Sequence, residues 1–455
     1  MLRRIGLTNF KCFESLDLPC ASLNLLCGLN GMGKSSVIQA LLVLRQSFET
    51  GDLQEGRLVL GGALTDLGAG SDVLFEDAAE EAVEFCLACR RQRSKSAELA
   101  TCPVTGEPTG GTFAPGADAT AKSVLNRLLS NAMKESDLGS QVKDIDAFRR
   151  ALAQAREAGV DRVQRPSEYF DPTVALGWLG AFRYSRAGDQ LTAVEREEAV
   201  DHAFQPWRDD PPFGGRLVYA QAERIGPRKF YPLSEVLARR GDLGARGEYA
   251  WNFLNDHQDE RLSADDPRRQ RTSGRRVLDV VDHWLQDVSP GAHLQLEAVL
   301  AADAVIAGFV FDRPGDVTSQ RHRATNVGFG LSYVLPVVLA LLSEPGTLCL
   351  IENPEAHLHP RGQTKLAELA VRAAAAGVQV FAETHSDHFL DGVRLAIHDG
   401  LIPPADVAIH YFERAGGRAV VSSPTIDADG RLSRWPAGFF DQHEENLARL
   451  LAPRS

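Results

Sequence analysis

A glycine-rich segment at residues 28–35 carries the clearest chemical pattern in the chain. It reads Gly-Leu-Asn-Gly-Met-Gly-Lys-Ser and matches G-x-x-x-x-G-K-[ST]. Glycines let a backbone wrap around a triphosphate and point its N–H groups inward. Lys34 supplies a positive charge for the β- and γ-phosphates, and the Ser35 hydroxyl can ligate Mg²⁺. The candidate nucleotide-binding residues are Asn30, Gly31, Gly33, Lys34, Ser35 and Ser36.

The segments on either side of this loop have the context that a phosphate-binding loop needs. Residues 22–27 form a short apolar run, which favours a buried strand. Residues 34–48 repeat apolar positions with helical spacing. A helix that starts at the loop places its positive N-terminus at the phosphates. The pattern therefore predicts a phosphate site rather than a chance glycine turn, although it does not name the nucleotide.

Three distal segments could complete such a site. The apolar run at residues 347–351 predicts a strand that ends in Glu352, which would deliver a carboxylate to the Mg²⁺ water shell. A second apolar run at residues 378–382 leads to His385, and a histidine there can lie against the γ-phosphate. Residues 326–332 hold two glycines and a serine before a helix, which again suits a phosphate.

The order of these motifs resembles the SMC/RecF/OLD-like branch of ABC-type ATPases, and in particular the bacterial ATPases of anti-phage defence systems. The resemblance covers most of residues 1–85 and 216–412. It implies ATP and Mg²⁺ as ligands, with Ser35 and Glu352 at the metal and His385 as the switch histidine. It also implies a signature segment that acts on ATP held by another subunit, formed by Gly328, Gly330 and Ser332. ATP would therefore bring together a dimer or a higher oligomer.

One position departs from the ABC pattern, which has Asp-Glu where this chain has Glu352-Asn353. Asn353 occupies the usual place of the general base, and an amide cannot take a proton from water. Glu355 is the candidate substitute. We expect slow hydrolysis of ATP, with a binding-only site as the alternative.

The alternation of helices and strands predicts an α/β fold, and the resemblance implies a P-loop NTPase of ABC/RecF type. It has a strand-rich N-terminal lobe, a mainly helical insertion with a flexible loop, and a C-terminal lobe with a parallel sheet. The predicted boundaries are residues 1–85, 86–215, 216–425 and a tail at 426–455. Residues 4–18 predict a hairpin, and residues 331–342 predict a helix with Pro336 near its first turn.

Composition narrows the class of partner and the compartment. The formal net charge is −12, which argues against a protein that coats nucleic acid but leaves a local basic groove open. Seven scattered cysteines and the lack of a signal-peptide pattern favour reduced thiols in the cytoplasm. The longest apolar run, residues 333–342, is too short to span a membrane.

Several residue groups have both a structural and a functional interpretation. Cys86, Cys89 and Cys102 offer thiols for zinc, but reduced thiols are expected. Arg224 and Arg228 could contact nucleotide or a partner, or form ordinary salt bridges. The segment that starts at Trp435 is expected to pack on the core or on a partner.

The predicted function is an ATPase that controls an effector protein, a nuclease or toxin, in anti-phage defence. Because about 70 residues follow His385 in this sequence, no Toprim nuclease domain is expected after it. The alternatives are a RecF-like repair ATPase that binds DNA, and an ATP-binding scaffold.

Overall fold

The structure is a computed structural model that describes residues 1–53, 55–90, 177–187, 190–193, 212–234, 241–269, 272, 274–314, 317–416, 418–435 and 442–451. The chain divides into two compact units, residues 1–92 with 177–455, and residues 93–176. The second unit, and with it most of the predicted insertion, lies outside the described residues. In the described part of the chain, no helix combines the length and the apolar character needed to cross a membrane.

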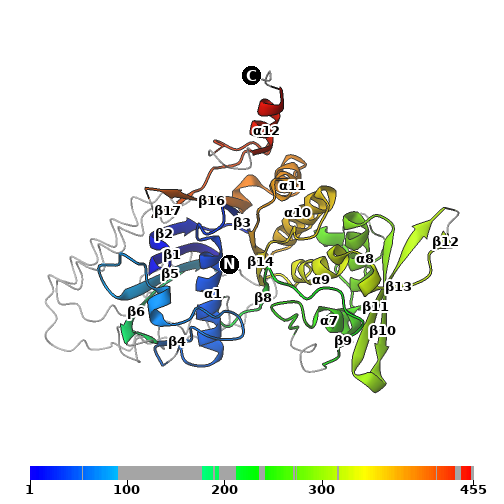
Figure 1. Cartoon of the computed structure of the whole chain (residues 1–455), viewed down its shortest axis with the longest axis horizontal. Coiled ribbons are helices and arrows are strands. Elements are labelled where there is room, and N and C mark those ends of the chain that lie inside the picture. The colour runs from blue at the N-terminus through cyan, green and yellow to red at the C-terminus, as the bar shows by residue number, and fades with distance from the viewer. Residues whose placement is uncertain are drawn as a thin grey trace, which may run out of the picture. The chain divides into compact units, whose positions relative to one another are not determined.

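A six-stranded, mostly parallel sheet carries the sequence motifs (Figure 1). Its strands, in spatial order, are β17 (Arg418–Ser422), β16 (Val407–Ala415), β3 (Leu23–Gly28), β15 (Gln379–Glu383), β14 (Leu348–Glu352) and β8 (Leu217–Ala220). Only the edge strand β17 runs antiparallel to its neighbour. β14 and β15 are almost continuously buried, which explains their unbroken apolar runs.

The strand order brings the ends of three motif-bearing strands together. β15 lies between β3 and β14, although it follows both in sequence. The register pairs Glu383 with Leu26 of β3 on one side and with Glu352 of β14 on the other. Ligands of open parallel sheets bind at the carboxyl ends of the strands, so this edge is where a site is expected.

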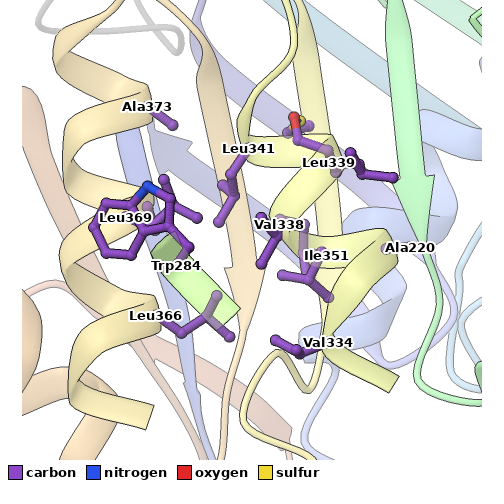
Figure 2. Close-up of a cluster of buried hydrophobic side chains, with 14 of the residues drawn as sticks. Ala220, Trp284, Val334, Val338, Leu339, Leu341, Ile351, Leu366, Leu369 and Ala373 are labelled. Atoms are coloured by element: carbon purple, nitrogen blue, oxygen red, sulfur yellow. The ribbon is translucent and has the colours of Figure 1, made fainter. Parts of the chain in front are cut away.

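Helices pack on this sheet and form its core. They are α1 (Lys34–Glu49), α9 (Phe329–Leu341), α10 (Pro360–Ala375) and α11 (Asp387–His398). Figure 2 shows the core where apolar side chains of α9 and α10 meet Ile351 of β14 and Ala220 of β8. Trp284 completes this layer; it is 1% exposed and donates its indole N–H to the carbonyl of Arg268 at 2.8 Å. α10 starts at Pro360, after the capping residue His359.

α9 differs from its prediction in one respect. It begins at Phe329, so Pro336 lies in the helix interior and not near the first turn. Proline has no N–H, and the carbonyl of Ser332 therefore loses its helical partner. The ring instead packs closely against the loop before α7: a Cβ added to Gly247 would lie 2.3 Å from the Pro336 Cγ.

A second, antiparallel sheet contains the predicted N-terminal hairpin. Its spatial order is β2 (Phe13–Pro19), β1 (Leu2–Phe10), β5 (Ala82–Arg90), β6 (Gly177–Ala187), β7 (Gln190–Ala193) and β4 (Arg57–Leu58), and the short helix α2 (Gly70–Val73) precedes β5. β6, β7 and the end of β5 fall within the range predicted to be an insertion. They form strands because β5 pairs with β1 on one side and with β6 on the other, and β6 is far from β5 in sequence.

The remaining elements form a small third sheet, its helices and the tail. The strands are β9 (Tyr231–Pro232), β10 (Ala292–Val299), β11 (Ala304–Arg313), β12 (Val317–Thr318) and β13 (His322–Arg323), and the helices are α7 (Ala250–His257), α8 (Val277–Val288) and α12 (Gln442–Leu451). In the tail, the ring of Trp435 lies 5.4 Å from the guanidinium of Arg394 on α11. Residues 436–441, which follow Trp435, lie outside the described residues, so the packing of this segment on the core or on a partner stays a prediction.

Candidate nucleotide-binding site

The loop between β3 and α1 has a backbone that requires its glycines. Gly28, Gly31 and Gly33 have φ values of 131°, 73° and 97°. A Cβ on Gly33 would lie 2.5 Å from both Cys12 Sγ and Phe13 Cζ, so any side chain there would displace the β1–β2 hairpin. The loop is thus fixed in shape by positive φ and by close packing, as a phosphate cradle must be.

Lys34 lies under this loop. Its side chain is 3% exposed, and Nζ donates to the carbonyl oxygens of Gly28 at 3.0 Å and Leu29 at 2.7 Å. Burial lowers the pKa of Lys34, and the charge of Glu383 opposes this shift. Asn30 and Gly31 are exposed at the loop tip, whereas Ser36 is buried in the first turn of α1.

Ser35 contacts a carboxylate that sequence reasoning did not select. Its hydroxyl donates to Glu383, with Oγ 3.0 Å from Oε1 and 2.8 Å from Oε2. Burial raises the pKa of Glu383 to about 7, and the charges of Glu352 and Glu355 act in the same direction. The signal that could have found Glu383 is that it ends a buried strand directly before Thr384 and His385.

Glu352 ends the next strand and is held from the other side. Its Oε1 accepts from the Tyr219 hydroxyl at 3.0 Å, and its Oε2 accepts from the backbone N–H of Ala222 at 3.1 Å. Both donors belong to β8 or to the loop after it. Glu352, the carboxylate predicted for Mg²⁺, is therefore oriented by groups of β8 and the loop after it. The hydroxyl of Ser35 is instead hydrogen-bonded to Glu383 at the end of β15.

Glu355 and His385 form one unit. The Glu355 carboxylate accepts from the Thr384 hydroxyl at 2.9 Å and from the His385 backbone N–H at 2.7 Å. Burial raises the pKa of Glu355. Burial, and next the charge of Lys34, lower the pKa of His385, which favours a neutral imidazole. Glu355 thus fixes the start of the loop that carries the switch histidine.

Asn353, at the position where a base was expected, has a backbone role. Its φ is 44°, a left-handed conformation that asparagine tolerates better than most residues. Its N–H donates to the carbonyl of Glu383 at 2.8 Å. Asn353 therefore ends β14 and ties it to the end of β15.

Arg224 is buried beside this edge. It is 3% exposed, and its guanidinium donates only to carbonyl oxygens in the described contacts: Gln221 at 2.9 Å, Tyr333 at 3.0 Å, Glu352 at 2.8 Å and Asn353 at 2.7 Å. Burial lowers its pKa to about 10. These contacts describe a residue that joins α9 to the end of β14, and not a surface salt bridge.

The predicted signature segment lies at the start of α9. Gly328 and Phe329 are exposed, and a Cβ on Gly328 would meet nothing within 4 Å. Gly330 is different, since a Cβ there would lie 2.7 Å from the carbonyl oxygen of His357. Ser332 is 1% exposed because it faces the core one turn into the helix. Its hydroxyl is not available at the surface of this chain.

The donor set at this edge fits Mg²⁺. The Ser35 hydroxyl, Glu383 and Glu352 offer oxygen atoms only, and Mg²⁺ takes one or two carboxylates together with the phosphates of its nucleotide. Lys34 and the loop amides provide the positive surroundings that a triphosphate needs.

Two family models of ATPase domains match the parts of the chain that contain these residues. Residues 1–98 match the AAA ATPase domain family, and residues 202–391 match a family described as AAA domain, putative AbiEii toxin, Type IV TA system. Residues 402–450 match a family described as a protein of unknown function (DUF3696). No curated protein is significantly similar to the chain in sequence.

Solved structures that resemble the chain include SMC head domains. An SmcHead bound to the C-winged helix domain of ScpA is 12% identical, with 93% of this chain and 98% of that chain covered and a TM-score of 0.47. The SMC head domain from Thermotoga maritima is 11% identical, with 92% and 98% covered and a TM-score of 0.40. With the loop, the strand order and the two ATPase family matches, the fold is that of a P-loop NTPase of ABC/RecF type.

Proposed function

We propose that the protein binds Mg²⁺·ATP at the edge formed by β3, β15 and β14, and hydrolyses it slowly. The observation that carries this proposal is the convergence of Lys34, Ser35 and two strand-end carboxylates, Glu352 and Glu383, around one glycine-rich loop. The loop amides and Lys34 bind the phosphates, and Ser35 orients its oxygen for the metal. Bound Mg²⁺ would neutralise charge on the phosphate oxygens.

Slow turnover follows from the groups near the place of the attacking water. The Asn353 amide takes no proton. The carboxylate of Glu355 already accepts hydrogen bonds from the Thr384 hydroxyl and the His385 N–H, so it mainly holds the backbone at His385 in place. A neutral His385 can accept or donate one hydrogen bond at the γ-phosphate. Such a site favours occupancy by ATP over rapid hydrolysis.

The active form in this proposal is a dimer or higher oligomer that assembles on ATP. The exposed N-terminus of α9, with Gly328 and Phe329, is available to a nucleotide held by a second subunit. We further propose that the ATP-bound form regulates a partner effector, a nuclease or toxin, in the cytoplasm during anti-phage defence. The family match described as a putative toxin of a Type IV TA system supports that setting.

Nucleotide binding tests the proposal directly. Lys34→Ala should abolish ATP binding measured by calorimetry, whereas Lys365→Ala, which removes a half-exposed lysine paired with Glu368, should leave it intact. Light scattering should show the wild-type chain gaining mass with ATP and Lys34→Ala failing to do so. Intact ATP binding in Lys34→Ala would refute the assigned site. Binding without any turnover in the wild-type chain would instead favour the scaffold alternative.

A further inference from the structure

We infer that Glu383 of β15 is the carboxylate that orients Ser35 for Mg²⁺ and supports the metal there, and that Glu352 at the end of β14 has a lesser part in binding the metal. This inference rests on the proposed function, because it assigns the metal within the same ATP site. It changes which strand controls the metal: β15, which also leads into the switch histidine, and not β14.

The first argument is distance along the sheet. β15 is the direct neighbour of β3, and Glu383 pairs in register with Leu26, two residues before the glycine loop begins. Glu352 pairs with Glu383 on the far side, so it is one strand further from the loop. A carboxylate at the end of β15 therefore reaches Ser35 directly, and the contacts show that it does.

The second argument is the direction of the Ser35 proton. A hydroxyl that ligates a cation through a lone pair must direct its hydrogen elsewhere. Here the acceptor is Glu383, with both carboxylate oxygens within 3.0 Å of Oγ. Acceptors of this kind orient metal ligands and raise their basicity. The same carboxylate adds a negative charge beside the position of the cation.

The third argument is that Glu352 is oriented by other donors. The Tyr219 hydroxyl takes one of its oxygens and the Ala222 N–H takes the other. Both donors come from the side of β8, away from β15 and the loop. Glu352 can still contribute its charge or bind through water, but it does not contact Ser35 in the described structure.

The experiment compares two isosteric variants, Glu383→Gln and Glu352→Gln, by calorimetric titration with ATP in Mg²⁺ and in EDTA. The quantity of interest is the ratio of the Kd in EDTA to the Kd in Mg²⁺, which reports the metal independently of turnover. Glu383→Gln should lower this ratio about 10-fold or more, the size typical of lost outer-shell support for a metal ligand. Its Kd in EDTA should stay equal or fall, because a negative charge near the phosphates is gone. Glu352→Gln should change the ratio less than about 3-fold.

The outcomes separate the two proposals. A wild-type chain that binds no ATP in either buffer overturns the proposed function itself. A wild-type chain that binds ATP, with a ratio that collapses in Glu352→Gln and persists in Glu383→Gln, overturns only the assignment of Glu383, as does an equal loss in both variants. Mn²⁺ binding in the presence of ATP, followed by electron paramagnetic resonance, gives a second readout. The spectrum should change in Glu383→Gln even if that variant melts at a lower temperature.

Discussion

Replacement of Arg224 by methionine should destabilise the protein and disturb the site at the same time. The variant loses the four hydrogen bonds from the guanidinium to carbonyl oxygens of the loop after β8, of α9 and of the end of β14. Bonds from a charged donor contribute about 1.5 kcal/mol each at the low end, or about 6 kcal/mol together.

Burial of the charge offsets part of this sum. The pKa of Arg224 falls to about 10, well under its ordinary value, and this shift corresponds to a cost of about 3 kcal/mol for the charged form. The net loss of stability in Arg224→Met is therefore about 3 kcal/mol. The control is Arg246→Met, which removes an exposed ion pair with Glu223 and should cost about 0.5 kcal/mol.

Urea unfolding followed by fluorescence measures the stability, and ATP titration with turnover measures the site. Arg224→Lys keeps the charge but lacks the planar guanidinium, so its urea midpoint should lie between those of Arg224→Met and the wild-type chain. Its turnover number should still fall by more than its ATP affinity, because the carbonyls of Glu352 and Asn353 lose their anchor while Lys34 is untouched. A midpoint in Arg224→Met equal to that of Arg246→Met would refute this account of Arg224.

Two further predictions follow from close packing and from burial. Gly330→Ala should lower stability and ATP-dependent assembly, because its Cβ would lie 2.7 Å from the carbonyl oxygen of His357. The control is Gly328→Ala, whose Cβ would meet nothing within 4 Å and which should keep the wild-type melting temperature. Equal melting temperatures for the two variants would contradict the packing argument. His410 is fully buried, and burial lowers its pKa to about 4. Since the unfolded value is about 6.5, the stability from neutral His410 is complete above pH 6.5 and is lost as pH falls towards 4, by up to about 3 kcal/mol. Urea midpoints measured between pH 7 and pH 4 should therefore fall less steeply in His410→Gln than in the wild-type chain, and parallel curves would show that His410 does not titrate this way.

Elements with a strong local pattern could be predicted closely. α1 lies within a residue of the helical run predicted at 34–48, and β3, β14 and β15 lie within a residue or so of the apolar runs that predicted them. Each has a pattern set by its own residues: a helical period in one case, and burial on both faces in the others. Pairing between distant segments has no such local signal, and the sequence therefore predicts an insertion where β6 and β7 form part of a sheet.

In the candidate site too, features set by neighbouring residues could be predicted from the sequence, and contacts between distant segments could not. The glycine loop specifies its own geometry, because positive φ at Gly28, Gly31 and Gly33 is a property of those residues. Which carboxylate meets Ser35 depends instead on the order of strands, and a motif written along the chain does not contain that order.

The burial of Ser332 has a similar cause. Its type and its place after two glycines suit a phosphate contact, but the helix begins at Phe329 and rotates Ser332 towards the core. The exposed positions are then those that precede it by a helical turn, Gly328 and Phe329. Arg224 joins Tyr333 of α9 to the backbone of Glu352 and Asn353, so in the proposed oligomer a contact at this exposed turn would act on an element that is linked to the end of β14. The start of α9 and the end of β14 are therefore linked by a buried guanidinium in addition to their packing in the core.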